Sequence, residues 1–254
     1  MFKNEQFSKL RRLNLIAAAF HFISGLIMVI ISTDLKVPIT GSFLHFDPST
    51  QSLAPKLDTL FDLHLGPLVA SFLFMSALAH LIISLPGIYE KYIKGLENRI
   101  NIYRWIEYSF SSSVMIIVVS LLVGISDLAT LILAAFANVS MILFGWMMEL
   151  HNQTTKKTNW TSYIFGCIAG IGPWVAIAIY LASPGSTSNP PTFVYWIFVS
   201  IFIFFNIFAI NQVLQYKGIG KWKDYVYGEK AYIFLSFIAK SLLAWQVFAG
   251  TLRP

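Results

Sequence analysis

Residues 232–245 read YIFLSFIAKSLLAW and place one lysine, Lys240, inside an apolar stretch. The stretch continues over residues 231–251, which is long enough to cross the hydrocarbon core of a bilayer as a helix. Lys240 lies about nine residues from one end of this stretch and about eleven from the other, or roughly 14 to 16 Å at 1.5 Å per residue. A lysine side chain does not reach water from that depth unaided, so the sequence predicts a charge buried in a membrane.

The composition of the whole chain also indicates a membrane protein. Of its 254 residues, 56% are hydrophobic and 12% are charged, which excludes an ordinary water-exposed surface. Aromatic residues make up 16% and exclude a disordered chain. The formal net charge is +6, but the basic residues lie in short runs between apolar stretches, which excludes a nucleic-acid-binding face. The single cysteine, Cys167, excludes an intrachain disulfide.

Six further apolar stretches have the length of a membrane span, so we expect an all-α bundle of seven transmembrane helices. Residues 1–254 then form a single domain. The expected spans are residues 13–33, 65–85, 101–124, 128–148, 160–182, 193–214 and 231–251. Turn residues follow the second, fifth and sixth spans, at Pro86-Gly87, Ser183-Pro184-Gly185 and Lys217-Gly218.

The basic residues of the loops predict the orientation of the chain. Loops on one side of the membrane carry fourteen Lys and Arg residues, among them Arg12 and Lys157, whereas loops on the other side carry three. Because cytoplasmic loops are enriched in Lys and Arg, we expect a multi-pass protein of the cell membrane with a cytoplasmic N-terminus and an extracellular C-terminus. We expect the first span to be retained, since its apolar core is too long for a signal peptide.

The longest connection, residues 34–64, lies on the expected extracellular side. Within it, residues 37–46 alternate loosely between apolar and polar side chains around Gly41, which predicts a short β-hairpin on the membrane surface.

A second intramembrane charge, Glu107, lies about two turns into the span 101–124. This position is counted from the same inner side of the membrane as that of Lys240, so the two side chains can lie at a similar depth in the bilayer. Ser111 follows Glu107 by four residues and Ser236 precedes Lys240 by four, so each charge has a hydroxyl on its own helical face. One interpretation is a structural salt bridge between helices, and the other is a functional site.

Two histidines, His21 and His80, lie at intramembrane positions in the first two spans. A single histidine in such a helix is commonly a packing residue, but two on neighbouring helices favour a small polar cavity. No cluster of Cys, Asp or Glu accompanies them in the sequence, so we expect no metal site.

The surroundings of Lys240 suggest a chemical role. A lysine amine in a dry pocket loses its proton readily and can form a Schiff base with an aldehyde. The protonated Schiff base needs one nearby carboxylate, a role that Glu107 can fill. Several side chains are suited to lining a slot for a long polyene, although such aromatic stripes taken alone are more often helix packing. They are Tyr108, Met141, Trp174, Phe202, Phe205 and Trp245, with Gly145 and Gly170 for close approach.

Seven spans, a lysine in the middle of the last and a carboxylate early in the third resemble a retinal-binding rhodopsin. An inward N-terminus is the reverse of ordinary microbial rhodopsins and resembles the heliorhodopsins. The resemblance covers essentially the whole chain and is carried, besides the long first outer loop, by Glu107-Tyr108-Ser109, Ser236 with Lys240, His21 and His80.

The resemblance implies that Lys240 bears all-trans retinal as a Schiff base, with Glu107 as counterion and Ser236 and Ser111 as hydrogen-bonding neighbours. It implies a hydrated cytoplasmic cavity lined by His21 and His80, and further pocket positions that match by approximate spacing at Asn138, Met141, Phe205 and Gln212. Similar proteins are homodimers in the lipid bilayer whose outer hairpin lies against the partner. The sequence does not indicate a signalling partner.

The function implied by this resemblance is a light sensor with a slow photocycle, and not an enzyme. Because Glu107 is the only acid expected well inside a span, with Asp127 and Glu149 at span ends, we expect no robust ion pumping. Two alternatives stay open. One is a light-driven proton pump or channel on the same scaffold, and the other is a light-independent carrier or receptor with a Lys240–Glu107 salt bridge.

Overall fold

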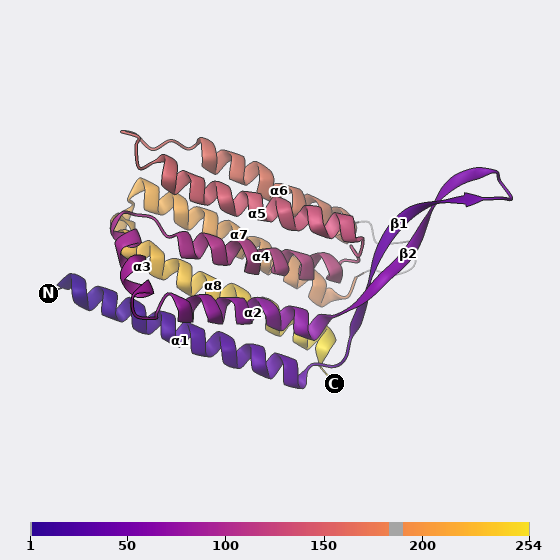
Figure 1. Ribbon diagram of the computed structural model, residues 1–254, viewed down its shortest axis with the longest axis horizontal. Helices are drawn as coiled ribbons and strands as arrows, with labels where there is room; N and C mark the ends of the chain where they lie inside the picture. The colour runs from indigo at the N-terminus through magenta and orange to yellow at the C-terminus, as the bar shows by residue number, and fades with distance from the viewer. Residues whose placement is uncertain (1, 183–189, 254) are drawn as a thin grey trace.

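The computed structural model describes residues 2–182 and 190–253. Seven helices in these residues are long and apolar enough to cross a membrane, namely α1 (Phe2–Ile31), α2 (Leu65–Ile82), α4 (Ile102–Leu122), α5 (Leu128–His151), α6 (Thr161–Ala182), α7 (Thr192–Lys217) and α8 (Tyr225–Val247). They lie side by side in one bundle (Figure 1), which confirms the predicted architecture. The turn predicted at Ser183-Pro184-Gly185 lies outside the described residues.

Several helices extend beyond the apolar spans. α1 begins at Phe2, and α8 begins at Tyr225, after a short 3-10 turn, η1 (Gly220–Lys223). At its other end α8 continues into one π-helical turn, η2 (Phe248–Leu252). Hydropathy marks only the part of a helix that faces lipid, whereas the backbone hydrogen bonds continue through polar turns outside it.

One helix, α3 (Ile88–Glu97), was not predicted. It is short and amphipathic, connects α2 to α4, and buries Tyr92 and Leu96. Gly87, at φ 77°, precedes α3, and a backbone with this positive φ favours glycine. Its apolar residues cover one face only, so the segment reads as a polar loop when hydropathy alone is considered.

The outer connection forms an antiparallel hairpin of two strands, β1 (Lys36–Asp47) and β2 (Ser52–His64), with an irregularity between Ile39 and Thr40. The predicted hairpin is confirmed, and it is longer than the sequence indicated. It projects outward beyond the end of the bundle (Figure 1). The amide of Thr40 donates to the carbonyl of Ser126 over 2.9 Å and so anchors the hairpin to the connection between α4 and α5.

Two clusters of buried apolar side chains fill the bundle. The larger includes Phe72, Ile116 and Leu243 and lies toward the hairpin end. The smaller includes Leu10 and Tyr92 and lies toward the end where α1 begins. α1 begins at one end of the bundle and α8 ends at the other, beside the hairpin (Figure 1), as an odd number of spans requires.

Candidate functional site

The two predicted intramembrane charges meet between α4 and α8. Lys240 Nζ lies 2.6 Å from Glu107 Oε1, and the two side chains are 4% and 9% exposed. The shared depth expected from the sequence is therefore present. A buried charge without a partner is strongly unfavourable, so each of these groups depends on the other.

A third member of this site, Ser76, comes from α2. Its Oγ accepts a hydrogen bond from Lys240 Nζ over 2.6 Å and donates to Glu107 Oε1 over 2.6 Å. Ser76 was not predicted from the sequence, because a serine inside a helix commonly bonds only to the backbone of its own preceding turn. The contact depends on how α2 packs against α4 and α8, which no local pattern reports.

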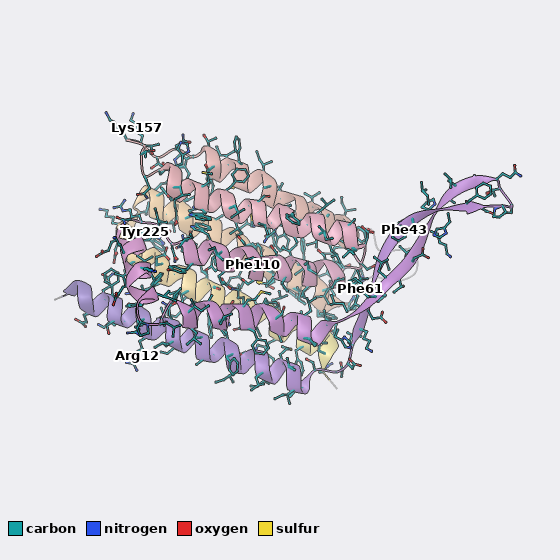
Figure 2. The ribbon with its side chains drawn as sticks, in the orientation of Figure 1. Arg12, Phe43, Phe61, Phe110, Lys157 and Tyr225 are labelled. Carbon is teal, nitrogen blue, oxygen red and sulfur yellow. The ribbon has the colours of Figure 1, made fainter. Side chains whose placement is uncertain are left out.

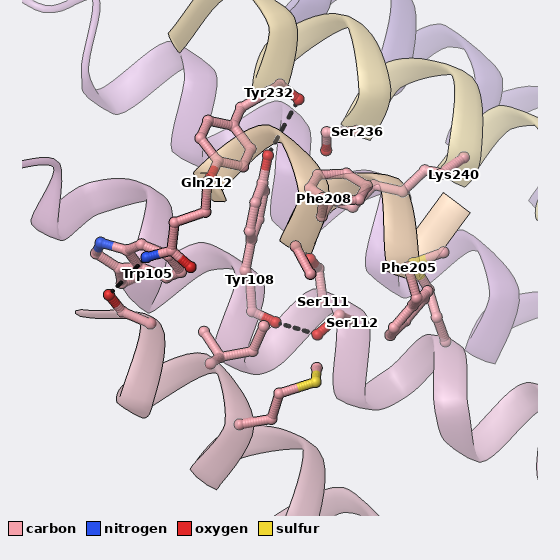
Figure 3. A pocket seen from close by; sticks show the side chains of 16 residues that line it. Trp105, Tyr108, Ser111, Ser112, Phe205, Phe208, Gln212, Tyr232, Ser236 and Lys240 are labelled. Carbon is pink, nitrogen blue, oxygen red and sulfur yellow. Dashed lines mark hydrogen bonds between the residues drawn. The ribbon is translucent and has the colours of Figure 1, made fainter. Parts of the chain in front are cut away.

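The predicted serines, Ser111 and Ser236, lie beside the ion pair. Their Oγ atoms are buried and have no hydrogen-bond partner within the described residues. Both side chains line the same cavity as Lys240 (Figure 3). Buried hydroxyls are nearly always hydrogen-bonded in folded proteins, so these two are suited to satisfy a polar atom placed next to the lysine.

An apolar cavity extends from Lys240 between α4, α5, α7 and α8 (Figure 3). Besides Lys240 and the two serines, its wall contains the predicted residues Tyr108, Met141, Gly145, Phe205 and Gln212. It also contains residues that were not predicted, namely Trp105, Ser112, Met115, Ile142, Phe208, Ala209, Tyr232 and Ala239. Aromatic and aliphatic side chains also fill ordinary helix contacts, so residue type alone does not separate the two uses.

Two polar side chains of this wall are hydrogen-bonded within the protein, whereas Tyr232 Oη has no hydrogen-bond partner among the described residues. Gln212 Nε2 donates to the carbonyl of Gly145 over 3.1 Å, and Tyr108 Oη donates to the carbonyl of Tyr232 over 3.1 Å. The wall therefore presents mainly apolar surface, except near Lys240.

Two other predicted pocket residues hold helices together outside this wall. Asn138 Nδ2 donates to Ser112 Oγ over 2.7 Å and to Ser113 Oγ over 3.0 Å, which ties α5 to α4. Gly170 lies against Met141, with which any side chain at position 170 would collide. Gly170 thus gives close approach to a side chain of the neighbouring helix.

Three predicted aromatic residues also lie outside the wall. Trp174 packs edge-on against Phe202 and Phe205, with ring centroids 5.2 and 5.3 Å apart. Phe202 is 41% exposed on the outside of the bundle. Trp245 packs against Phe248, with centroids 5.6 Å apart. Trp174 packs against Phe205, which lines the cavity, so it lies one layer outside the cavity wall. Trp245 packs nearer the hairpin end.

The two histidines lie side by side, as the sequence suggested. Their rings are stacked, with centroids 6.0 Å apart and an angle of 8° between the planes. His80 Nδ1 lies 2.7 Å from Asn14 Oδ1. Neither ring nitrogen of His21 has a hydrogen-bond partner in the described part of the chain. His80 and Glu107 line a second, more polar cavity, of which His21 does not form the wall.

The second cavity leads from Glu107 toward the end of the bundle where α1 begins, and there it reaches a buried charged cluster. Arg104 forms ion pairs with both Glu149 and Glu229, and the three side chains are 4%, 2% and 2% exposed. Glu149 and Glu229 lie near helix ends and not well inside a span, but both are buried, which the sequence did not indicate. Glu229 lies outside the expected span 231–251 but inside α8, which begins at Tyr225. The positive charge of Arg104 neutralises part of the negative charge of the two glutamates.

The half of the bundle next to the hairpin has a different character. Between Lys240 and the hairpin end, the buried side chains that the structure describes are mainly apolar, with uncharged polar groups such as Ser113 and Ser120 among them, and none is Asp, Glu, Lys, Arg or His. Among the described residues, buried ionisable groups thus lead away from the Lys240–Glu107 pair in one direction only. This asymmetry bears directly on whether ions can cross.

Solved structures with the same fold are rhodopsins. A light-driven proton pump from Leptosphaeria maculans matches with a TM-score of 0.65 and 13% identity over 94% of each chain. Exiguobacterium sibiricum rhodopsin matches with a TM-score of 0.64 and 13% identity over 97% of this chain and 96% of that one. The transmembrane domain of Salpingoeca rosetta rhodopsin phosphodiesterase matches with a TM-score of 0.62 and 10% identity over 98% of this chain and 88% of that one. At these identities the likeness shows the fold alone.

The family comparison is more specific. No curated protein matches the chain. The model of the heliorhodopsin family matches residues 10–252, which include Lys240, Glu107 and nearly all of the seven-helix bundle. The resemblance found in the sequence is thereby confirmed, and the chain belongs to the heliorhodopsins, a family of seven-helix transmembrane retinal proteins.

Proposed function

We propose that this protein is a light sensor that carries all-trans retinal on Lys240, with Glu107 as the counterion. When bound, retinal supplies a polyene that absorbs visible light and changes shape, and its aldehyde carbon can join to a lysine amine. The observation that carries the proposal is the buried Lys240–Glu107 pair at the wall of an apolar, aromatic cavity. A cation in a low-dielectric interior needs one compensating negative charge, and Glu107 supplies it.

The residues around Lys240 fit a long conjugated aldehyde. Tyr108, Phe205 and Phe208 provide flat apolar surface, and they lie along the cavity that begins at the lysine (Figure 3). A side chain at position 145 would collide with the ring of Trp105, so Gly145 leaves room for this indole in the cavity wall.

The surroundings of the ion pair favour a sensor over a pump. Ser76 and Glu107 orient the positive charge of Lys240, and a light-driven change in its direction would weaken these contacts. A proton that leaves would meet His80 and Asn14 on one side, and apolar packing on the other. The proton would leave toward the polar cavity and return to the nitrogen of Lys240 from that same cavity. We therefore expect a slow photocycle without net transport.

The orientation and assembly form part of the same proposal. The end where α1 begins, which contains the polar cavity, would face the cytoplasm, and the hairpin would face outward. Exposed apolar side chains on the hairpin, including Leu44 and Leu57, suit a homodimer contact. We propose no enzymatic activity for this chain, so a signal would leave through a separate protein.

A proton pump is the second candidate, because Glu149 and Glu229 are buried on the inner side and could serve as proton-exchanging groups. Illumination of vesicles that contain the retinal-loaded protein distinguishes the two. The sensor predicts no sustained pH change, and a sustained change that a protonophore abolishes would establish the pump. For retinal binding itself, the visible absorption band should be present in the wild type and absent in Lys240→Ala.

A further inference from the structure

A third cavity, of about 480 Å³, opens at the end of the bundle where α1 begins. Its volume is in the range of ligand cavities in proteins. The turn before α4, the connection from α5 to α6 and the connection from α7 to α8 form its wall. Figure 2 shows Lys157 and Tyr225 at this end, opposite the hairpin. Five cationic side chains line this basic cavity, namely Arg99, Lys156, Lys157, Lys217 and Lys223.

These five cations lack anionic partners. The wall contains no Asp or Glu, and none of the five side chains forms an ion pair within residues 2–182 and 190–253. Other lysines of this protein do have partners, such as Lys9, which lies 2.6 Å from Glu5. Like charges gathered around one hollow repel each other and focus a positive potential into it. A bound anion would relieve this repulsion.

Hydrogen bonds hold the loops of the basic cavity in place. Asn152 Oδ1 accepts from Thr155 Oγ1 over 2.9 Å and from the amide of Asn159 over 2.7 Å. Gln153 Nε2 donates to the carbonyl of Asn98 over 3.0 Å and joins the α5–α6 connection to the turn before α4. The cations of these two connections are therefore gathered before a ligand arrives, which reduces the entropy lost on binding.

One carboxylate connects the basic cavity with the cavity of Lys240. Tyr225 lines the basic cavity and donates from Oη to Glu149 Oε1 over 3.0 Å. Trp105 lines the Lys240 cavity and donates from Nε1 to Glu149 Oε2 over 2.6 Å. Glu149 thus links the walls of the two cavities through one hydrogen bond to each.

We propose that the basic cavity binds a multiply charged phosphate anion and that Tyr225, Glu149 and Trp105 relay its occupancy to the Lys240 cavity. Phosphate oxygens accept hydrogen bonds from guanidinium and ammonium groups, and a guanidinium such as that of Arg99 can bind two of them at once. The phosphate can belong to a soluble molecule or to a lipid headgroup. The relay rests on the proposed function, whereas the binding does not.

The binding is tested with inorganic pyrophosphate and the purified protein in an uncharged detergent, by titration calorimetry at low and at high salt. The Arg99→Gly/Lys156→Gln variant should weaken binding at least about tenfold, because two cations in contact with the anion are lost. The backbone at position 99 has a φ of 59°, a left-handed conformation that glycine adopts readily, so the substitution retains the turn.

The matched control is Lys91→Gln/Lys94→Gln, which removes the same charge from α3 outside the basic cavity and should bind like the wild type. Equal affinity of the cavity variant and this control, or no saturable binding at all, overturns the proposal. Nanodiscs with and without phosphatidic acid distinguish the source. If the cavity takes a lipid headgroup, phosphatidic acid should compete with pyrophosphate and weaken its binding to the wild type, whereas equal affinity in both nanodiscs indicates a soluble phosphate as the ligand.

The relay is tested with retinal-loaded protein at saturating pyrophosphate. The visible band should shift in the wild type and not in Tyr225→Phe, which keeps the ring but loses the hydrogen bond to Glu149. An unshifted wild-type band, or an equal shift in the variant, overturns the relay. Absence of any visible band contradicts both the relay and the proposed function, while the calorimetric result still decides the binding.

Discussion

Glu107 is the carboxylate that contacts Lys240, and its replacement tests the proposed counterion. Glu107→Gln should move the visible band of the protonated pigment to longer wavelength, because an anion that stabilises the positive charge near Lys240 is lost. Ser76→Ala removes a neutral dipole from the same contact and should cause a smaller shift. Absorption spectra of both variants are compared with that of Ser84→Ala, whose hydroxyl bonds only to the backbone carbonyl of His80. An unchanged band in Glu107→Gln would mean that another group balances the charge.

At the scale of residues, the sequence predicted groups whose environment is set by their own helix. Lys240 and Glu107 stand out because charge is rare inside an apolar span, and Ser111 and Ser236 follow from the four-residue spacing on one helical face. Ser76 could not be found in this way. Its two bonds cross from one helix to two others, and that geometry comes from tertiary packing.

At the scale of elements, α5 offers a test of helix capping. Asp127 accepts hydrogen bonds from the amide of Thr130 over 2.8 Å and from its hydroxyl over 2.7 Å. These bonds hold the pKa of Asp127 below its ordinary value. Loss of an N-cap lowers the free energy of unfolding by about 1 kcal/mol, so Asp127→Ala should unfold at a lower temperature at pH 7.

The same cap predicts a pH dependence. A carboxyl group with a lowered pKa in the folded state stabilises the protein above its unfolded-state pKa, and this contribution is lost as the pH falls through the folded-state pKa. The melting temperatures of wild type and Asp127→Ala should therefore converge in acid. Asp62→Ala, which changes an exposed acid of the hairpin, serves as the control. A difference that persists unchanged in acid contradicts the role of the carboxylate.

The elements themselves were predictable to the extent that they face lipid. Every transmembrane helix coincides with an apolar stretch, since a helix in a bilayer must present apolar side chains over its full crossing. The polar first turns of α8 carry Glu229, and α3 has one apolar face only, so neither segment produces a long apolar run. The buried charged cluster was missed for this reason.

At the scale of the whole molecule, the hairpin should hold two copies together. Leu44 and Leu57 are 68% and 65% exposed on it, and exposed apolar patches of this kind mark interaction sites. The Leu44→Lys/Leu57→Lys variant should change the mass measured by light scattering in detergent from that of a dimer to that of a monomer. Thr50→Lys, at the hairpin tip, should leave the dimer intact. A double variant that stays dimeric would locate the contact elsewhere on the bundle.

The orientation is also a property of the whole molecule. Figure 2 shows Arg12 and Lys157 at one end and the hairpin residues Phe43 and Phe61 at the other, so the basic end and the hairpin lie on opposite sides. In a Cys167→Ala background, a cysteine replacing Ser49 in the hairpin should react with a membrane-impermeant maleimide in intact cells. A cysteine replacing Thr155 should react only after lysis. The opposite labelling pattern would reverse the proposed topology.

Within the described residues, the bundle buries the charged cluster of Arg104, Glu149 and Glu229 on one side of Lys240 and no charged side chain on the other. A polar cavity on the side of the cluster was expected from the resemblance, but the charged cluster was not. Composition reports how many polar residues a span contains but not which of them face the interior. Arg104, Glu149 and Glu229 converge because three helix ends meet there, and this convergence supports proton exchange with one side only. The prediction of no pumping now rests on this one-sided arrangement, because Glu107 is not the only acid that the bundle buries.

The attachment of retinal to Lys240 is the claim on which the proposed function depends. Borohydride reduction of the retinal-loaded protein makes the bond to the amine permanent, and digestion followed by mass spectrometry locates it. We expect the peptide that contains Lys240 to carry the retinyl mass, and the Lys240→Ala protein to carry none. A retinyl group on another lysine, or an unmodified Lys240 in protein that shows a visible band, would contradict the account.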